Sequence, residues 1–463
     1  MASPDSPPSK SDLLLDAAAR AAHYTASERV RPVIPSPAAV DRLGSFEFNA
    51  ILDRPLEPSD VIALLDEVGG AATVASTGGR YFGFVTGGVE PVGLAASVLA
   101  GAWDQNAALP VMSPVAAHLD AIAADWVVDL LGLPTDAVAT FCAGASVANL
   151  TAVITARDAL LRRVGWDTAA DGLTGAPPID IAASAEIHSS IPKALRLAGL
   201  GVGSVHELPT DEFGRVRPEA IPGGLLGSLR PTLVLLQAGN VNTGHSDPFA
   251  AVIDRFDPET SWVHVDGAFG LWANAAPSRR HLLTGVEHAD SWATDGHKWL
   301  NTPYDCGVVI VADPTSLTAS MSMDAAYAGG GGGRSPMNLG LQMSQGARAI
   351  PVWAILASLG RAGVAEAIER CCRHAERFAV ELSAADVSVV CPPALNQVLV
   401  SFGDDATTDT VIERVQASGV AWMGGTTWQG RRAMRISVSD TSTTDDDVGR
   451  AITAILAARP SSE

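Results

Sequence analysis

Short apolar runs alternate with segments of helical periodicity from about residue 135 to residue 315. The runs TLVLLQAG at 232–239 and WVHVD at 262–266 are apolar at nearly every position, as in strands that are buried on both faces. Strands of this kind, separated by helices, predict an α/β fold with a mostly parallel central sheet covered on both faces. Ligands bind at the carboxyl ends of the strands in such sheets, so the polar residues after each run are the first candidates for a site.

The flanking segments predict two smaller parts. Residues 11–24 form a predicted helix with Ser11 as its cap, and a second helix starts at Ser113-Pro114 and ends at Leu133-Pro134. We therefore predict an N-terminal arm and helical segment over 1–134, a large domain over 135–350 and a small α/β domain over 351–463. The last part has predicted helices at 352–359, 364–382, 408–417 and from 444, and predicted strands at 397–402, 420–422 and 432–437.

Charge and composition exclude several classes of partner. The chain has 463 residues and a net charge of −20, and its longest basic clusters are pairs or triplets, which argues against nucleic acid and anionic membranes. The longest apolar stretch, 91–103, is shorter than the ~20 residues of a membrane span. Five cysteines without a CxxC pattern, and no apolar core near the N-terminus, indicate a cytoplasmic protein with reduced thiols.

An aspartate and a lysine stand out in the stretch 261–307. Asp266 ends a buried strand, and Lys298 follows 32 residues later inside DGHKW. Taken singly, such an Asp is most often a turn or capping residue, and a single Lys is usually a solvated charge. The neighbours of Lys298, however, are too apolar for an exposed lysine. A buried carboxylate and a lysine in one pocket suit pyridoxal 5'-phosphate (PLP), because the amine forms a Schiff base and the carboxylate keeps the pyridine nitrogen protonated.

A second candidate is the turn Gly144-Ala145-Ser146 at the start of a predicted helix. Backbone N–H groups, a hydroxyl and the positive end of a helix dipole together make an anion site, although an ordinary capped helix start explains the same residues. GxGxxG and Walker motifs do not occur in the sequence, so a dinucleotide or a nucleoside triphosphate is not supported. No metal is expected.

The segments HVDGAFG (264–270), DSWATDGHKWLN (290–301) and YDCG (304–307) resemble the pyridoxal-dependent decarboxylase family, group II, which includes aromatic-L-amino-acid and glutamate decarboxylases. The resemblance covers about 45–455. It implies the PLP-dependent transferase fold of aspartate aminotransferase (fold type I) and a homodimer with shared active sites, in which the N-terminal arm packs on the partner. By this resemblance Lys298 binds PLP, Asp266 pairs with the ring nitrogen, and His188 stacks on the ring. The other implied cofactor residues are Gly144, Ala145, Ser146, Asn242, Ser291, Asp295 and His297.

The resemblance also indicates where a substrate binds. It places Phe84, Val85 and Thr86 along the substrate pocket, whereas a core strand explains these aromatic positions equally well. Arg435 is either a carboxylate-binding residue or a salt-bridged structural arginine. A glycine-rich segment, 321–345, is predicted to be a mobile loop that closes over the substrate.

The loop sequence leaves the reaction open. The catalytic tyrosine of the family falls near Pro336, where no tyrosine occurs, and Tyr327 could take its place through a shifted loop. The leading hypothesis is α-decarboxylation of an L-amino acid by a PLP-dependent carboxy-lyase. The alternative is an aldehyde synthase, an aldolase or another carbon–carbon lyase on the same scaffold. A non-catalytic relative disagrees with the presence of Asp266, His188, Ser146 and Lys298.

Overall fold

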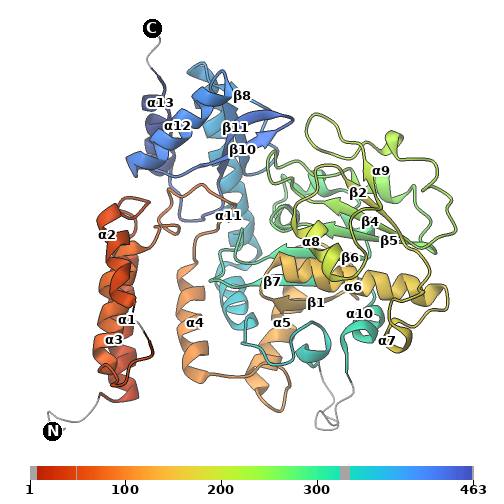
Figure 1. Cartoon of the computed structure of the whole chain (residues 1–463), viewed down its shortest axis with the longest axis horizontal. Helices are drawn as coiled ribbons and strands as arrows, with labels where there is room; N and C mark the ends of the chain where they lie inside the picture. The colour runs from red at the N-terminus through yellow and green to blue at the C-terminus, as the bar shows by residue number, and fades with distance from the viewer. Residues whose placement is uncertain (1–7, 48–49, 324–333, 461–463) are drawn as a thin grey trace.

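The computed structural model describes residues 8–47, 50–323 and 334–460, and a seven-stranded sheet forms its centre (Figure 1). The strand order is β1-β7-β6-β5-β4-β2-β3. Strand β7 runs antiparallel to β1 and β6, and the other neighbours pair in parallel. The mostly parallel α/β sheet predicted from the sequence is therefore confirmed. The strands are β1 Val138–Cys142, β2 Asp180–Ser184, β3 Val205–Leu208, β4 Thr232–Gln237, β5 Ser261–Asp266, β6 Ser291–Asp295 and β7 Gly307–Val311.

Helices cover both faces of this sheet. In β4, Leu233 and Leu235 pack toward one face and Val234 and Leu236 toward the other, which explains why the run is apolar at every position. The first face is covered by α6 (Ala145–Arg163), α8 (Ser190–Leu197) and α10 (Pro314–Met321). The second face is covered by α5 (Pro114–Leu130) and α11 (Ala349–Ala384). Two short helices, α7 (Thr168–Asp171) and α9 (Phe249–Ile253), lie in the connections.

A small antiparallel sheet forms the C-terminal part of the molecule. Its strand order is β10-β11-β9-β8, and helices α12 (Asp405–Ser418) and α13 (Asp445–Ala457) accompany it. The strand predicted at 420–422 was wrong: Trp422 makes a single bridge to Tyr81, and the strand begins at Gly424. The strands are β8 Ser388–Val389, β9 Gln397–Ser401, β10 Gly424–Trp428 and β11 Arg431–Ser437.

Helix α11 runs through the middle of the molecule, between the two sheets (Figure 1). The sequence predicted two helices here, and the structure has one stretch, Ala349–Ala384, that is interrupted by Gly360 with φ 58° and ψ −179°. Among the described residues, α11 is the one helix that is long and apolar enough to cross a membrane by length and composition. Its residues Ile355, Ile368 and Phe378 are buried in the core, as expected for the central helix of a globular domain.

The N-terminal helices stand to one side of the body (Figure 1). Helix α1 (Lys10–Ser27) is capped by Ser9 instead of the predicted Ser11, because the Ser9 side chain accepts the N–H of Asp12, whose carboxylate accepts the N–H of Ser9 in return. No residue of α1 is buried. It is followed by α2 (Pro37–Asp41), α3 (Pro58–Leu64) and α4 (Pro91–Trp103). Short 3-10 or π segments are Arg42–Phe46, Leu65–Gly69, Gly70–Ala72, Pro218–Ala220, Gly270–Ala275, Arg280–Leu283, Val286–His288 and Pro336–Asn338.

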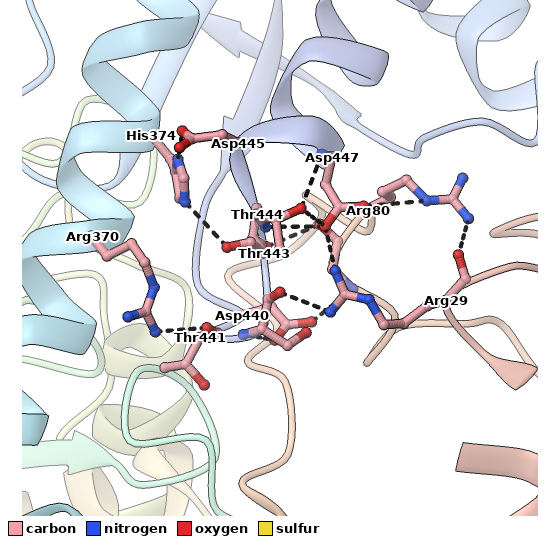
Figure 2. A network of polar contacts seen from close by, with 12 residues as sticks. Arg29, Arg80, Arg370, His374, Asp440, Thr441, Thr443, Thr444, Asp445 and Asp447 are labelled. Atoms are coloured by element: carbon pink, nitrogen blue, oxygen red, sulfur yellow. Dashed lines mark hydrogen bonds and ion pairs between the residues drawn. The ribbon is translucent and has the colours of Figure 1, made fainter. Parts of the chain in front are cut away.

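A polar network around the loop before α13 joins three regions of the chain (Figure 2). Asp447 accepts a hydrogen bond of 2.7 Å from Arg29 and lies 3.8 Å from Arg80, both in the N-terminal part. From α11, Arg370 donates to the carbonyl of Thr441 at 2.7 Å. The N-terminal part thus contacts the first turn of α13, and α11 contacts the loop before it. The domain boundaries predicted at 134 and 350 stay predictions.

Candidate active site

A cleft lies at the carboxyl ends of β4, β5 and β6. It consists of two adjoining hollows that share His188, Ala268 and Lys298. The first hollow is also lined by Asp266, the last residue of β5, and the second by the turn that leads from β1 into α6. Segments far apart in the sequence thus meet where an open α/β sheet binds its ligands. Predicted site residues that line the cleft are Phe84, Val85, Gly144, Ala145, Ser146, His188, Asp266, Asp295, His297, Lys298 and Arg435.

Lys298 lies on a tightly held turn after β6. Its Nζ atom is 3.1 Å from Oδ2 of Asp295. Asn301, at φ 54°, donates to the Lys298 carbonyl at 2.9 Å and to the Ser439 carbonyl of the small domain at 2.8 Å. A Cβ on Gly87 would lie 2.0 Å from the Lys298 carbonyl oxygen, so only glycine permits this approach. The segment 84–88 is therefore held directly against the lysine turn.

Three donors hold the carboxylate of Asp266. Its Oδ2 atom accepts from Asn149 Nδ2 and from Ser190 Oγ, both at 3.0 Å, and its Oδ1 atom accepts from the backbone N–H of Ala268 at 3.2 Å. These three hydrogen bonds fix the orientation of the carboxylate. A buried, oriented acid thus lines the same hollow as Lys298.

The anion cradle forms at the start of α6. Gly144 caps this 19-residue helix without a side chain, and Ser146 is exposed at the helix N-terminus. The N–H of Ala145 donates to Oδ1 of Asp295 at 2.6 Å, so the helix terminus already binds one oxyanion. A Cβ on Gly307 would lie 2.4 Å from Cα of Gly144, and the close approach of β7 to the turn therefore needs glycine there.

Two histidines in the cleft are held in the neutral form. Burial lowers the pKa of His188, whose Nδ1 atom lies 2.9 Å from Oγ and 3.2 Å from the backbone nitrogen of Ser190. Burial likewise lowers the pKa of His297, whose Nδ1 atom accepts the N–H of Cys306 at 3.2 Å. Neutral rings add no fixed charge beside a bound ligand.

The segment around Phe84 has a strained backbone. Phe84 and Val85 have φ values of 52° and 59°, which are uncommon for residues other than glycine and least favourable for a β-branched one. Phe84 is 64% exposed and stacks on Trp422, with ring centroids 5.2 Å apart. Phe82, in contrast, is buried against Phe378. The segment is no strand, and its aromatic residues divide between the core and the cleft.

The small domain contributes Arg435 to the cleft. Burial lowers the pKa of this arginine, and the hydrogen-bond acceptor that the described residues give it is the Val241 carbonyl, 3.4 Å from Nη1. No ion pair of the described residues includes it, so the interpretation as a salt-bridged structural arginine is not supported. Arg435 is thus a cation with no paired acid in the described part of the chain, and it lines the same hollow as Lys298 and Asp266.

Four predicted site residues are not placed in the cleft. Ser291 is the first residue of β6, at the opposite end of the strand from Asp295 and so roughly 13 Å away, and it binds Trp262 Nε1 at 2.9 Å. Asn242 accepts from Thr426 at 2.9 Å, and the backbone N–H of Thr86 donates to the Gly83 carbonyl at 2.9 Å. Tyr327, like much of the predicted mobile loop, lies outside the described residues.

Sequence reasoning missed several residues that build the site. Asn149 and Ser190 hold Asp266, and Tyr304 lines the second hollow with its ring 4.4 Å from that of His297. Gln237 and Phe269 line the first hollow. The sequence offered a signal for Asn149, because this amide stands one turn after Ala145 on a helix face that is otherwise apolar. The structure shows that it is fully buried.

A lysine, a buried acid and an anion cradle in one cleft of a mostly parallel sheet define a protein of the PLP-dependent type. The chain belongs to the pyridoxal-dependent decarboxylase family, whose conserved domain matches residues 72–403. It is 28% identical to tryptophan decarboxylase 1 of Oryza sativa subsp. japonica over 396 residues, 78% of this chain and 76% of that one. It is 32% identical to phenylacetaldehyde synthase of Arabidopsis thaliana over 229 residues, 47% of this chain and 45% of that one.

The fold is shared with solved structures. The crystal structure of Oryza sativa TDC with PLP and tryptamine superposes with a TM-score of 0.88 at 24% identity, covering 99% of each chain. The seven-stranded sheet and the small antiparallel sheet are thus those of pyridoxal-dependent decarboxylase structures.

Proposed function

We propose that this protein is a PLP-dependent carboxy-lyase that removes the α-carboxylate of an L-amino acid. The observation that carries the proposal is the meeting of Lys298, Asp266, His188 and the Gly144–Ser146 turn in one cleft. The family to which the chain belongs supports it, because decarboxylases are among the relatives.

The residues of the cleft fit the cofactor. When bound, PLP supplies an electron sink for the charge that is left on the substrate carbon. Lys298 would hold its aldehyde, and the N-terminus of α6, where the N–H of Ala145 already donates to the Asp295 carboxylate, would hold its phosphate. The carboxylate of Asp266 would accept a hydrogen bond from the protonated ring nitrogen, and the neutral ring of His188 would cover one face.

The position of Arg435 indicates that the substrate carries an acidic group. The guanidinium of Arg435 is half-buried and has no acid paired with it among the described residues, which is costly, and a bound carboxylate would offset that cost. Phe84, exposed in the cleft, and the buried Val85 give the remaining wall an apolar character. The side chains around the substrate decide which bond lies perpendicular to the cofactor ring and breaks, so the shape of this hollow selects the reaction.

A second candidate is an aldehyde synthase or another carbon–carbon lyase on the same scaffold. Pro336, where the family tyrosine was expected, is a buried residue of a 3-10 segment, and Met337 donates to the carbonyl of Ala108 at 3.2 Å. A residue at another position would therefore protonate the product, and Tyr327 stays the predicted candidate. The likeness to phenylacetaldehyde synthase favours the same candidate.

We also propose that the active protein is a homodimer formed through its N-terminal arm. Helix α1 buries none of its residues, and Leu14, Leu15 and Leu65 are 45%, 69% and 54% exposed. Apolar side chains on an unpaired helix gain stability when a second copy covers them. Light scattering on the purified protein should give twice the mass of the chain, 95.4 kDa from 2 × 47.7 kDa, and a monomer would contradict this proposal.

A product screen tests the reaction. Protein supplied with PLP is incubated with each of the twenty amino acids, and amines, aldehydes, ammonia and carbon dioxide are measured. Amine and carbon dioxide in equal amounts support decarboxylation, whereas aldehyde and ammonia support the second candidate. Lys298→Ala is the control, since it removes the amine and should abolish turnover of either kind. Activity that survives Lys298→Ala would overturn the proposal.

A further inference from the structure

A chain of buried polar groups leads from the core to the cleft along one face of β5. Because strand side chains alternate, Trp262, His264 and Asp266 lie on the same face. His264 is 0% exposed, as are Ser291 on β6 and Asn149 on α6, which connect it to its neighbours. Neither His264 nor Asn149 lines the cleft, so neither touches a ligand there.

The donor and the acceptor of each hydrogen bond in this series of buried groups can be assigned. An ionised carboxylate only accepts, so the amide NH₂ of Asn149 must face Asp266, at 3.0 Å. The Asn149 Oδ1 atom therefore faces Nε2 of His264, at 2.9 Å, and Nε2 carries the proton. The Nδ1 atom then accepts from Ser291 Oγ at 3.0 Å, and Ser291 Oγ accepts the indole N–H of Trp262 at 2.9 Å.

The environment of His264 agrees with this assignment. Burial lowers its pKa to about 4, so the ring is neutral at pH 7 and has one N–H to donate. Without that donor, the Asn149 carbonyl oxygen would be buried and unsatisfied, which costs about 1–3 kcal/mol. The amide could then rotate and turn its oxygen toward Asp266, where it would repel the carboxylate.

We propose that His264 and Asn149 are positioning residues that keep the carboxylate of Asp266 directed at the cofactor's ring nitrogen. This inference rests on the proposed function. The indole of Trp262 and the hydroxyl of Ser291 determine the tautomer of His264. The imidazole of His264 then determines the orientation of the Asn149 amide, and the amide determines the orientation of the Asp266 carboxylate. Ser291 therefore has a role inside the core, where it helps to fix the tautomer of His264.

Three variants separate positioning from packing. His264→Leu removes the donor and keeps an apolar side chain of moderate size. His264→Gln can still offer an N–H to Asn149 from a similar place. His374→Leu is the matched control, because His374 is also buried, at 5% exposure, and its Nε2 atom contacts the Thr443 carbonyl at 3.1 Å, away from the cleft (Figure 2).

The readouts are the affinity for PLP, the pH titration of the visible absorbance of bound PLP, kcat with KM, and thermal unfolding. His264→Leu should weaken PLP binding or lower kcat by about 10- to 100-fold, as losses of outer-shell partners do at metal sites, and should shift the absorbance titration. His264→Gln should restore most of the lost PLP affinity or kcat and most of the wild-type absorbance titration. His374→Leu should lower thermal stability and leave affinity, titration and kcat at wild-type values.

Two results would overturn the inference. In the first, His264→Leu behaves like His374→Leu, changing stability alone. In the second, nitrogen-15 NMR of the protein without PLP finds the His264 proton on Nδ1. A wild-type protein that forms no visible band with PLP would instead overturn the proposed function itself, so the two failures are distinguishable.

Discussion

At the scale of single residues, the site depends on charges that the protein holds in place before any ligand arrives. Asp266 receives three hydrogen bonds, and Lys298 and the N–H of Ala145 share the carboxylate of Asp295. A bound phosphate would therefore share the α6 terminus with Asp295, whose negative charge is offset by Lys298. Groups that are oriented in advance stabilise developing charge without reorganisation.

Replacing Asp266 tests the electron-sink role. Asp266→Ala removes the acceptor for the ring nitrogen and should lower kcat by about 10²- to 10³-fold, the usual effect of losing one preorganised electrostatic group. PLP should stay bound, because Lys298 and the α6 terminus remain. The measurement is kcat together with the cofactor content of the purified variant. An unchanged kcat would show that Asp266 does not have this role.

The cysteines give a second prediction at this scale. All five are buried and unpaired, and burial raises the pKa of Cys142, Cys306 and Cys371 to about 12. The thiolate is the reactive form, so the folded protein should react very slowly with a thiol reagent such as DTNB at pH 8. All five should react after denaturation. Rapid labelling of the native protein would contradict the burial of these thiols.

At the scale of elements, the cradle depends on how closely β7 passes the turn into α6. A Cβ on Gly307 would lie 2.4 Å from both the carbonyl carbon and Cα of Gly144, and backbone atoms cannot rotate away as a side chain can. The antiparallel pairing of Cys142 with Gly307 fixes this distance. The position of the cradle is therefore set by the register of β1 on β7.

We expect Gly307→Ala to weaken both the fold and the cradle. Overpacking of this kind typically costs about 1–3 kcal/mol of unfolding free energy, and the displaced Gly144 turn should bind PLP less tightly. The control is Gly203→Ala, where a Cβ meets nothing within 4 Å, and stability should change by no more than about 0.5 kcal/mol. Urea unfolding and PLP titration measure the two effects. If Gly307→Ala and Gly203→Ala changed stability and PLP affinity equally, the close approach of Gly307 to Gly144 would be contradicted.

At the scale of the whole molecule, a buried polar loop joins the N-terminal part to the small domain. Asp440 accepts from the N–H of Gly79 at 3.0 Å and of Ser442 at 2.7 Å, and Arg80 and Arg370 contact the same region (Figure 2). The segment from Gly79 to Gly88, which includes Phe84 and Val85, is thus held by the small domain.

The pH dependence of stability tests this buried acid. Burial raises the pKa of Asp440 from its ordinary 3.8 to about 6, so the folded state binds this proton more tightly than the unfolded state. The contribution of Asp440 to the free energy of unfolding is largest below pH 3.8. It falls as pH rises through 6 and is constant at higher pH. Asp440→Asn removes this decline, and its unfolding free energy minus that of wild type should rise between about pH 4 and pH 6.5 and then level off. Urea unfolding across that range measures the difference, and a constant difference would show that Asp440 has an ordinary pKa.

The sequence alone determined the parts of this protein that depend on local pattern. Apolar runs specify β4 and β5 because strands buried on both faces have no polar positions, and residues that follow the strands must lie at the carboxyl edge. Asp266, Lys298 and the Gly144–Ser146 turn were found in this way. Ser291, which only the resemblance placed among the cofactor residues, is the first residue of β6 and lies at the opposite edge of the sheet.

Only the tertiary structure decided which side chains complete the site. Asn149 reaches Asp266 because α6 packs across β5, and the two residues are 117 positions apart in the chain. The position of Arg435 in the cleft depends on the docking of the small sheet, and the path of the segment 84–88 depends on the close approach of Gly87 to the Lys298 carbonyl. Contacts of this kind arise from packing between distant segments, and packing is a property of the fold as a whole that no local pattern in the chain contains.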